Sequence, residues 1–243
     1  MISKTRHTTL ILLLGGTGSR FDAGTPKQFL RLLDDETPLF MQSLRAIHKH
    51  LIIDHLILAV NKEYLQSTDL LEPVEALKKA NPEMKIDIVE GGRTRHESFK
   101  NAAAKIISNE SHALLLHDAN RPFISDSFGA AIAQQVSLLS TEKTCLIPVI
   151  PSVDSLCKVS EMGKVVNYLS RETTCRIQTP QLIYAPALKE ALKKSQNFHP
   201  DSGDISNVDY TDEGSFMLGM GFDVYTFPGD PANIKITTRG DLR

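Results

Sequence analysis

A glycine-rich loop near the N-terminus brings backbone amides and cationic side chains together. After the apolar run Leu10–Leu14 come Gly15, Gly16, Thr17 and Gly18, followed closely by Arg20 and Lys27. Glycines let a backbone turn so that several N–H groups point at one anion. The two cations would attract the same anion. We therefore predict a phosphate-binding site here, with a purely structural turn as the alternative.

This loop does not match the two most common phosphate motifs. A P-loop requires Gly-Lys-Ser/Thr in a fixed register, whereas this chain has Pro26-Lys27-Gln28. A dinucleotide-binding fingerprint requires a third glycine where Phe21 stands. These differences argue against a P-loop nucleotidase and against a nicotinamide-dependent oxidoreductase.

Two further polar motifs could do chemistry. The first is Gly91-Gly92-Arg93-Thr94-Arg95-His96-Glu97-Ser98, and the second is His117-Asp118-Ala119-Asn120-Arg121-Pro122. Paired glycines let a flat base approach the backbone, although the first motif could equally be an ordinary turn into a helix. A carboxylate facing a triphosphate is a usual ligand of Mg²⁺, which predicts a metal ligand at Asp118. The alternative is an Asp118–Arg121 ion pair that only shapes the loop.

The pattern of apolar residues predicts the elements that position these motifs. We expect strands at 10–14, 52–60, 85–90, 113–117, 145–150 and 223–227, and helices at 39–47, 70–80, 98–107, 128–139 and 182–194. Alternation of strands and helices predicts an α/β fold: a Rossmann-like, mostly parallel sheet with helices on both faces. Loops that follow parallel strands meet at one edge of the sheet, so the three motifs should converge there.

The segment 151–178 lacks a helical period. Lys158–Ser160 and Lys164–Val166 flank Glu161-Met162-Gly163, which predicts a β-hairpin with a short turn. We expect this hairpin to protrude as an arm that serves dimerisation. The stretch from Gln196 to Tyr210 is rich in Asn, Asp, Ser and Gly and is expected to be a loop.

The overall composition favours one ordinary globular domain spanning residues 1–243. The chain has 243 residues and a net charge of −2, which gives no support for a nucleic-acid-binding protein. Three cysteines (Cys145, Cys157 and Cys175) have no metal-ligand spacing and favour free thiols in a reducing compartment. No apolar stretch is long enough to span a bilayer, so we expect a cytoplasmic protein without a membrane partner.

The motifs together resemble a known family of enzymes. G-G-T-G-S-R-F followed by T-P-K-Q-F-L, then G-G-x-x-R-x-x-S, H-D-A-N-R-P, T-P-Q, T-D-E-G-S and N-I-K-I-T-T occur in order from Leu10 onward. They are similar to those of the 2-C-methyl-D-erythritol 4-phosphate cytidylyltransferases, with ribitol-5-phosphate cytidylyltransferases as near relatives. The chain departs from that pattern at Asn120, where a small residue is usual, in a longer 196–210 loop, and in a shorter C-terminal end.

The resemblance implies a role for each motif. Arg20, Lys27 and Lys235 would neutralise charge on the reacting phosphates, and Gly15, Gly16, Thr17, Gly18, Gly92, Ser98 and Asp118 would bind the nucleotide. Asp118 would also hold Mg²⁺. Thr211, Lys235 and Arg171 would bind the acceptor phosphate, Arg171 by reaching across a homodimer.

The implied reaction transfers CMP from CTP to a small polyol phosphate and releases pyrophosphate. We favour 2-C-methyl-D-erythritol 4-phosphate as the acceptor, which would place the protein in isoprenoid precursor synthesis. Ribitol 5-phosphate is the alternative acceptor, and a non-catalytic CTP-binding regulator is the alternative of another class.

Overall fold

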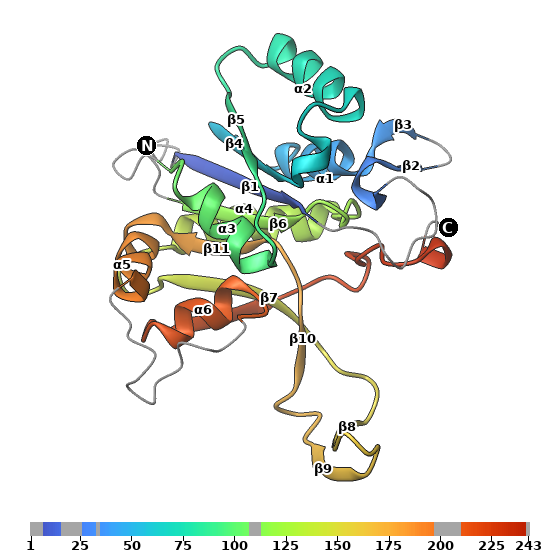
Figure 1. The fold of residues 1–243 in the computed structure, drawn as a ribbon. Coiled ribbons are helices and arrows are strands. Elements are labelled where there is room, and N and C mark those ends of the chain that lie inside the picture. The colour runs from blue at the N-terminus through green and yellow to red at the C-terminus, as the bar shows by residue number, and fades with distance from the viewer. Residues whose placement is uncertain (1–6, 16–25, 33–34, 107–112, 197–209, 242–243) are drawn as a thin grey trace.

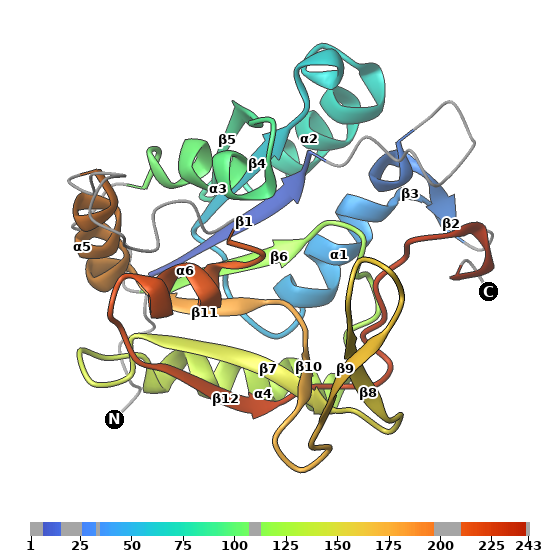
Figure 2. The ribbon, with the colours of Figure 1, turned by 60° about the horizontal axis from the view of Figure 1, so that its bottom comes forward.

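The described part of the protein is built on a central sheet with helices on both faces (Figure 1). The computed structural model describes residues 7–15, 26–32, 35–106, 113–196 and 210–241. Within these residues the sheet contains eight strands: β1 (Thr8–Leu14), β4 (His55–Val60), β5 (Lys85–Glu90), β6 (Ala113–Asp118), β7 (Cys145–Pro151), β10 (Cys175–Ile177), β11 (Gln181–Tyr184) and β12 (Val224–Pro228). Their order across the sheet is β10-β7-β11-β6-β1-β4-β5, and β12 pairs with β7 alongside it (Figure 2).

Most neighbouring strands are parallel, as the sequence predicted. β1 lies between β4 and β6 and is parallel to both, and β5 continues the parallel order beyond β4. β11 is antiparallel to both β6 and β7. The carboxyl ends of β1, β5 and β6 therefore lie at the same edge, which places the three polar motifs together.

The unbroken apolar strands are explained by helices on both sides of the sheet. The side chains of Leu10, Leu12 and Leu14 belong to one buried cluster, and Ile11 belongs to the cluster on the opposite face. The first cluster packs against α1 (Leu39–His48), α2 (Thr68–Ala80) and α4 (Asp126–Leu138), and the second against α3 (Arg95–Ala103), α5 (Ala185–Gln196) and α6 (Glu213–Gly219). A strand covered on both faces must be apolar at every position rather than at alternate ones.

Several short elements lie outside the central sheet. Among them are the 3-10 helices Lys27–Phe29, Lys62–Tyr64 and Arg239–Asp241, and the two-stranded pair β2 (Arg31–Leu32) and β3 (Asp35–Pro38). None of the helices in the described ranges is long and apolar enough to cross a membrane.

The predicted arm is present as a hairpin that stands away from the sheet (Figure 1). β8 (Leu156–Val159) and β9 (Val165–Leu169) pair antiparallel with one another, and Gly163 turns between them with φ of +76°. A left-handed φ favours glycine, which explains the residue at this turn. Apolar side chains on the arm remain exposed, among them Met162 at 91% and Tyr168 at 72%.

In the C-terminal half, one predicted boundary was wrong and one helix was not predicted. The predicted helix 182–194 begins only at Ala185, because Gln181–Tyr184 form β11, which is buried between β6 and β7. Hydrogen bonds from two flanking strands favour the extended conformation of this short apolar run over helix. The sequence also missed α6 (Glu213–Gly219), whose seven residues contain two glycines. Of the predicted 196–210 loop, residues 197–209 lie outside the described residues.

Smaller differences concern where elements begin. β4 starts at His55 rather than at Ile52, whose side chain is exposed. α3 spans Arg95–Ala103 rather than 98–107, so that its first turn carries part of the Gly91–Ser98 motif. Thr94 caps this helix by accepting a hydrogen bond from the Glu97 N–H, and the Glu97 side chain bonds back to the cap. This capping box explains why the helix starts three residues earlier than its apolar pattern indicated.

Candidate active site

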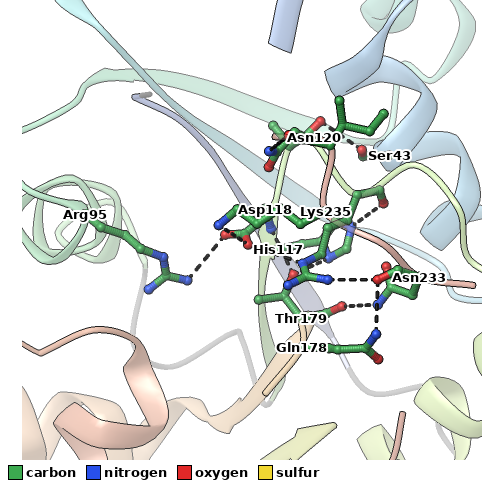
Figure 3. Close-up of polar contacts among 12 residues, drawn as sticks. Ser43, Arg95, His117, Asp118, Asn120, Gln178, Thr179, Asn233 and Lys235 are labelled. Carbon is green, nitrogen blue, oxygen red and sulfur yellow. Dashed lines mark hydrogen bonds and ion pairs between the residues drawn. The ribbon is translucent and has the colours of Figure 1, made fainter. Parts of the chain in front are cut away.

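A carboxylate at the end of β6 lies among three cationic side chains. Asp118 Oδ2 is 2.8 Å from Lys235 Nζ and 3.4 Å from Arg121 Nε, and Asp118 Oδ1 is 3.6 Å from Arg95 Nη2 (Figure 3). Burial alone would raise the pKa of the Asp118 carboxyl, but Lys235, Arg95 and Arg121 hold that pKa well below its usual range. The Asp118–Arg121 pair, which was the alternative interpretation of this motif, is present as one part of a larger cluster, and Asp118 stays ionised.

Two cavities meet at this cluster. The larger, of about 350 Å³, is lined by Gly15, Lys27, Gln28, Gly92 and Ser98, among others. The smaller, of about 330 Å³, is lined by Arg121, Thr179, Gln181 and Thr211, among others. Arg95, Asp118 and Lys235 line both. Molecules bound in the two cavities would come together at these three side chains.

The turn of the Gly91–Ser98 motif forms one wall of the larger cavity. Ser98 Oγ accepts a hydrogen bond from the Gly92 N–H at 3.0 Å and donates to Thr94 O at 3.0 Å. A Cβ atom added to Gly92 would lie 2.1 Å from Glu97 Cβ, which is far inside van der Waals contact. The close approach to the capping box therefore requires glycine at this position, and the Ser98 hydroxyl holds the turn.

Lys27 reaches the larger cavity from a short 3-10 helix. Its neighbour Gln28 is buried and donates from Nε2 to Leu14 O at 2.6 Å. This bond fastens the helix Lys27–Phe29 to the end of β1 and thereby keeps Lys27 beside the Gly15 end of the glycine loop. The remaining predicted residues of that loop, Gly16, Thr17, Gly18 and Arg20, lie outside the described residues.

A buried carboxylate that the sequence analysis did not single out positions Arg95. Arg95 Nη1 lies 2.6 Å from each carboxylate oxygen of Glu213, whose residue is fully buried. Burial raises the pKa of Glu213 to about 7, and Arg95 opposes that shift. Glu213 lies in the first turn of α6 after the cap Asp212, so the acidic run in T-D-E-G-S was the available signal. The acidic run alone does not point to Arg95, because the contact depends on α6 packing on the same side of the sheet as α3.

A chain of hydrogen bonds fixes the loop that carries Asp118. Thr179 Oγ1 accepts from the Asp118 N–H at 3.1 Å and lies 2.9 Å from His117 Nδ1, while His117 Nε2 donates to Arg121 O at 3.0 Å. Because a carbonyl oxygen can only accept, the histidine proton sits on Nε2. In the neutral ring Nδ1 is then the acceptor, and the Thr179 hydroxyl donates its proton to it. Burial lowers the pKa of His117 to about 4, consistent with a neutral ring.

The structure separates the predicted acceptor-binding residues. Thr211 and Lys235 line the smaller cavity. Arg171 follows β9 in the arm and is exposed, and it lines neither of the two cavities. In one copy of the chain, Arg171 is therefore not brought together with the other site residues.

Any metal bound here would depend on Asp118 together with ligand oxygens. Within the described residues there is no group of three or more His, Cys, Asp or Glu side chains placed to hold a metal ion. Mg²⁺ commonly binds to one or two carboxylates plus phosphate oxygens and keeps several waters. A single ionised carboxylate at the junction of the two cavities fits that kind of site.

The neutral His117 predicts a loss of stability in acid. Its pKa is 6.5 in an unfolded chain and about 4 in the folded protein, which corresponds to roughly 3 kcal/mol of stabilisation. This contribution is present above pH 6.5 and is lost as the pH falls towards 4. In His117→Gln, which cannot titrate, the free energy of unfolding should fall less steeply across this range, measured by urea denaturation.

The matched control is His7→Gln, because the side chain of His7 is 56% exposed. It should keep a slope close to that of the wild type. An equally steep acid-side loss in His117→Gln would contradict the neutral, buried state of His117.

Comparison with known proteins agrees with this geometry. The sequence profile of the family 2-C-methyl-D-erythritol 4-phosphate cytidylyltransferase matches residues 8–243. The enzyme of that name from Bacteroides fragilis is 32% identical over 235 residues, covering 97% of this chain and 96% of the relative. The enzyme of that name from Thermosipho africanus is 30% identical over 237 residues, covering 96% and 93%.

Solved structures share the fold. The crystal structure of 2-C-methyl-D-erythritol 4-phosphate cytidylyltransferase from Francisella tularensis superposes with a TM-score of 0.71 at 24% identity, covering 97% of this chain and 96% of that one. The similarity in sequence and fold thus extends over nearly the whole chain. The protein belongs to the 2-C-methyl-D-erythritol 4-phosphate cytidylyltransferase family.

Proposed function

We propose that this protein transfers the cytidylyl group of CTP to 2-C-methyl-D-erythritol 4-phosphate and releases pyrophosphate, as a step in isoprenoid precursor synthesis. Membership in the family supports the reaction. The observation that carries it is the junction of two cavities at Arg95, Asp118 and Lys235. A transfer between two substrates requires two adjoining binding sites with the charged groups between them.

The larger cavity suits the nucleotide. It combines the end of the glycine loop at Gly15, the cation Lys27 and the Gly92 turn. We assign the phosphates of CTP to the first two features and the base to the Gly92 turn, which lines the same cavity. The smaller cavity, with Arg121, Thr211 and Lys235, would take the acceptor phosphate.

The reaction requires charge neutralisation more than acid–base catalysis. An oxygen of the acceptor phosphate attacks the α-phosphorus of CTP, a new P–O bond forms, and the bond to the bridging oxygen of pyrophosphate breaks. The attacking oxygen is already anionic, so no general base is needed. Lys27 and Lys235, together with Arg20 of the glycine loop, would stabilise the negative charge that develops on the transferred group.

Asp118 would hold Mg²⁺ in the loaded enzyme. The fit rests on an ionised carboxylate that lines both cavities. Bound Mg²⁺ would neutralise phosphate oxygens and make pyrophosphate a better leaving group. Arg95, Arg121 and Lys235, which contact the carboxylate here, would then share their charge with the phosphates.

The first test measures pyrophosphate release from CTP and Mg²⁺ with each of two acceptors. We expect turnover with 2-C-methyl-D-erythritol 4-phosphate. Lys27→Ala should lower kcat by about 100- to 1000-fold, the usual cost of removing one group that stabilises transition-state charge. Lys62→Ala is the matched control, because Lys62 also begins a 3-10 helix and is exposed.

The outcomes separate the alternatives. Turnover only with ribitol 5-phosphate would change the acceptor, and CTP binding without pyrophosphate release would indicate a regulator. An unchanged kcat in Lys27→Ala would overturn the proposed role of the lysine.

A second prediction concerns the Gly92 turn. Gly92→Ala forces a clash with Glu97 at 2.1 Å and should weaken CTP binding by about 5- to 150-fold, the range expected for overpacking. In Gly91→Ala the nearest contact is Ser98 Oγ at 3.2 Å, so the loss should be much smaller. Isothermal titration with CTP compares the two variants. Equal losses would show that the Gly92 turn does not form the base-binding wall.

We also propose that the protein forms a homodimer through the arm and that Arg171 completes the partner's acceptor site. The exposed apolar side chains of the arm, such as Met162 and Tyr168, support a protein–protein interface. The absence of Arg171 from both cavities of its own protomer supports a role across the dimer. The cytoplasmic location stays a prediction, supported by three cysteines that are free thiols.

Subunit complementation tests this arrangement. Lys27→Ala and Arg171→Ala chains, each inactive alone, are mixed and allowed to exchange subunits. Half of the resulting dimers contain one chain of each kind, and each such dimer has one intact site, made of Lys27 from one chain and Arg171 from the other. The mixture should therefore recover about a quarter of wild-type activity. Lys27→Ala mixed with Lys235→Ala is the control and should recover nothing, since both residues line the same protomer's cavity. No recovery in the first mixture would place Arg171 outside the partner's site.

A further inference from the structure

Lys235 lies on a segment that has no regular secondary structure. Residues 233–237 form neither strand nor helix, yet Lys235 Nζ lies 2.8 Å from Asp118 Oδ2. The side chain is 40% exposed and is not packed in the core. Something other than a ladder of backbone hydrogen bonds must therefore position this cation.

Side chains fasten the beginning of the segment. Asn233 O accepts from Arg121 Nη1 at 2.8 Å and from Gln178 Nε2 at 3.1 Å. Asn233 Nδ2 donates to Thr179 O at 2.8 Å, and Figure 3 shows these bonds beside Lys235. The chain is thus held two residues before Lys235.

Asn120 fastens the segment directly after Lys235. Its Nδ2 donates to Ile236 O at 2.5 Å, and the Ile236 N–H donates back to Asn120 O at 2.9 Å. Asn120 is only 6% exposed, and Ile236 is buried in a small cluster with Leu39. These two bonds link residue 236 to the same loop that carries Asp118, two residues before Asn120.

The Asn120 side chain makes only one of the two bonds to Ile236, the one from Nδ2. A smaller residue, such as alanine, keeps the backbone bond from Ile236 and loses the bond from Nδ2. A carbonyl oxygen accepts only from a donor, so the amide nitrogen and not the amide oxygen faces Ile236 O. The asparagine that stands where a small residue is usual therefore adds a specific hydrogen bond to Ile236.

We propose that Asn120 is a positioning residue that holds Lys235 against Asp118 by fastening Ile236 with its side-chain amide. The proposal rests on the cytidylyl transfer proposed above, in which Lys235 stabilises the developing charge. Asn120 acts through Lys235 and takes no part in the reaction itself.

A double-mutant cycle tests the link to Lys235. Asn120→Ala should lower kcat by about 2- to 10-fold, the factor expected for one hydrogen bond, with little change in the KM for CTP. In a Lys235→Ala background the same substitution should have almost no further effect on kcat, because the side chain that it positions is gone. Asn81→Ala is the matched control: Asn81 Nδ2 also donates to a backbone carbonyl, that of Leu77, at the end of α2.

A second readout does not depend on activity. Acylation of lysines, followed by mass spectrometry, should label Lys235 about 2- to 10-fold faster in Asn120→Ala than in the wild type, because its pairing with Asp118 is loosened. Lys78 is the internal reference, since it is 45% exposed and pairs with Glu75 at 2.7 Å. Its labelling should be the same in both proteins.

The two readouts separate this proposal from the proposed function. If the wild type releases no pyrophosphate but Asn120→Ala still increases the labelling of Lys235, the transfer reaction is wrong and the positioning stands. Unchanged labelling would overturn the positioning. An equal loss of kcat in the wild-type and Lys235→Ala backgrounds would show that Asn120 acts independently of Lys235 and would also overturn it.

Discussion

The Asp118 carboxylate is within ion-pair distance of cations from three separate parts of the chain. Arg121 belongs to its own loop, Arg95 to the start of α3 and Lys235 to a C-terminal segment. Leaving this buried carboxylate without partners would lower the stability of the folded protein by several kcal/mol. Folding therefore has to bring all three segments together. The side chains that meet there, Arg95, Asp118 and Lys235, form the boundary between the two cavities.

The cluster is also where negative substrates would meet. Arg95, Arg121 and Lys235 face two carboxylates, Asp118 and Glu213, which leaves one formal positive charge before Lys27 is counted. The whole chain carries −2. The attraction for phosphates is therefore a local property of the site. The carboxylates already hold these cations in place before a substrate binds. Phosphates that enter would compete with the carboxylates for the same cations.

Much of the site is held by side chains that bond to backbone atoms rather than by helices and strands. Gln28 fastens the helix of Lys27 to β1, Thr179 and His117 hold the Asp118 loop, and Asn120 fastens the residue after Lys235. Such bonds hold irregular segments that a sheet ladder cannot reach. They also make the geometry of each cation depend on an uncharged side chain elsewhere in the sequence.

The sequence by itself determined the α/β class, the parallel strands that carry the three motifs, and their convergence at one edge. It could do so because apolar runs and glycine turns are local signals, and because parallel strands place their following loops together. It also indicated Asp118, Lys27 and Lys235 through the order of the motifs.

Only the tertiary structure decided which distant segments are in contact, and with them which charged groups pair. Gln181–Tyr184 became a strand because two neighbouring strands bond to it, and Glu213 met Arg95 because α6 packs on the same face as α3. Asn120 met Ile236 across 116 residues of sequence. No local pattern encodes such contacts, since they depend on how distant segments pack in three dimensions, and packing routinely overrides local preference.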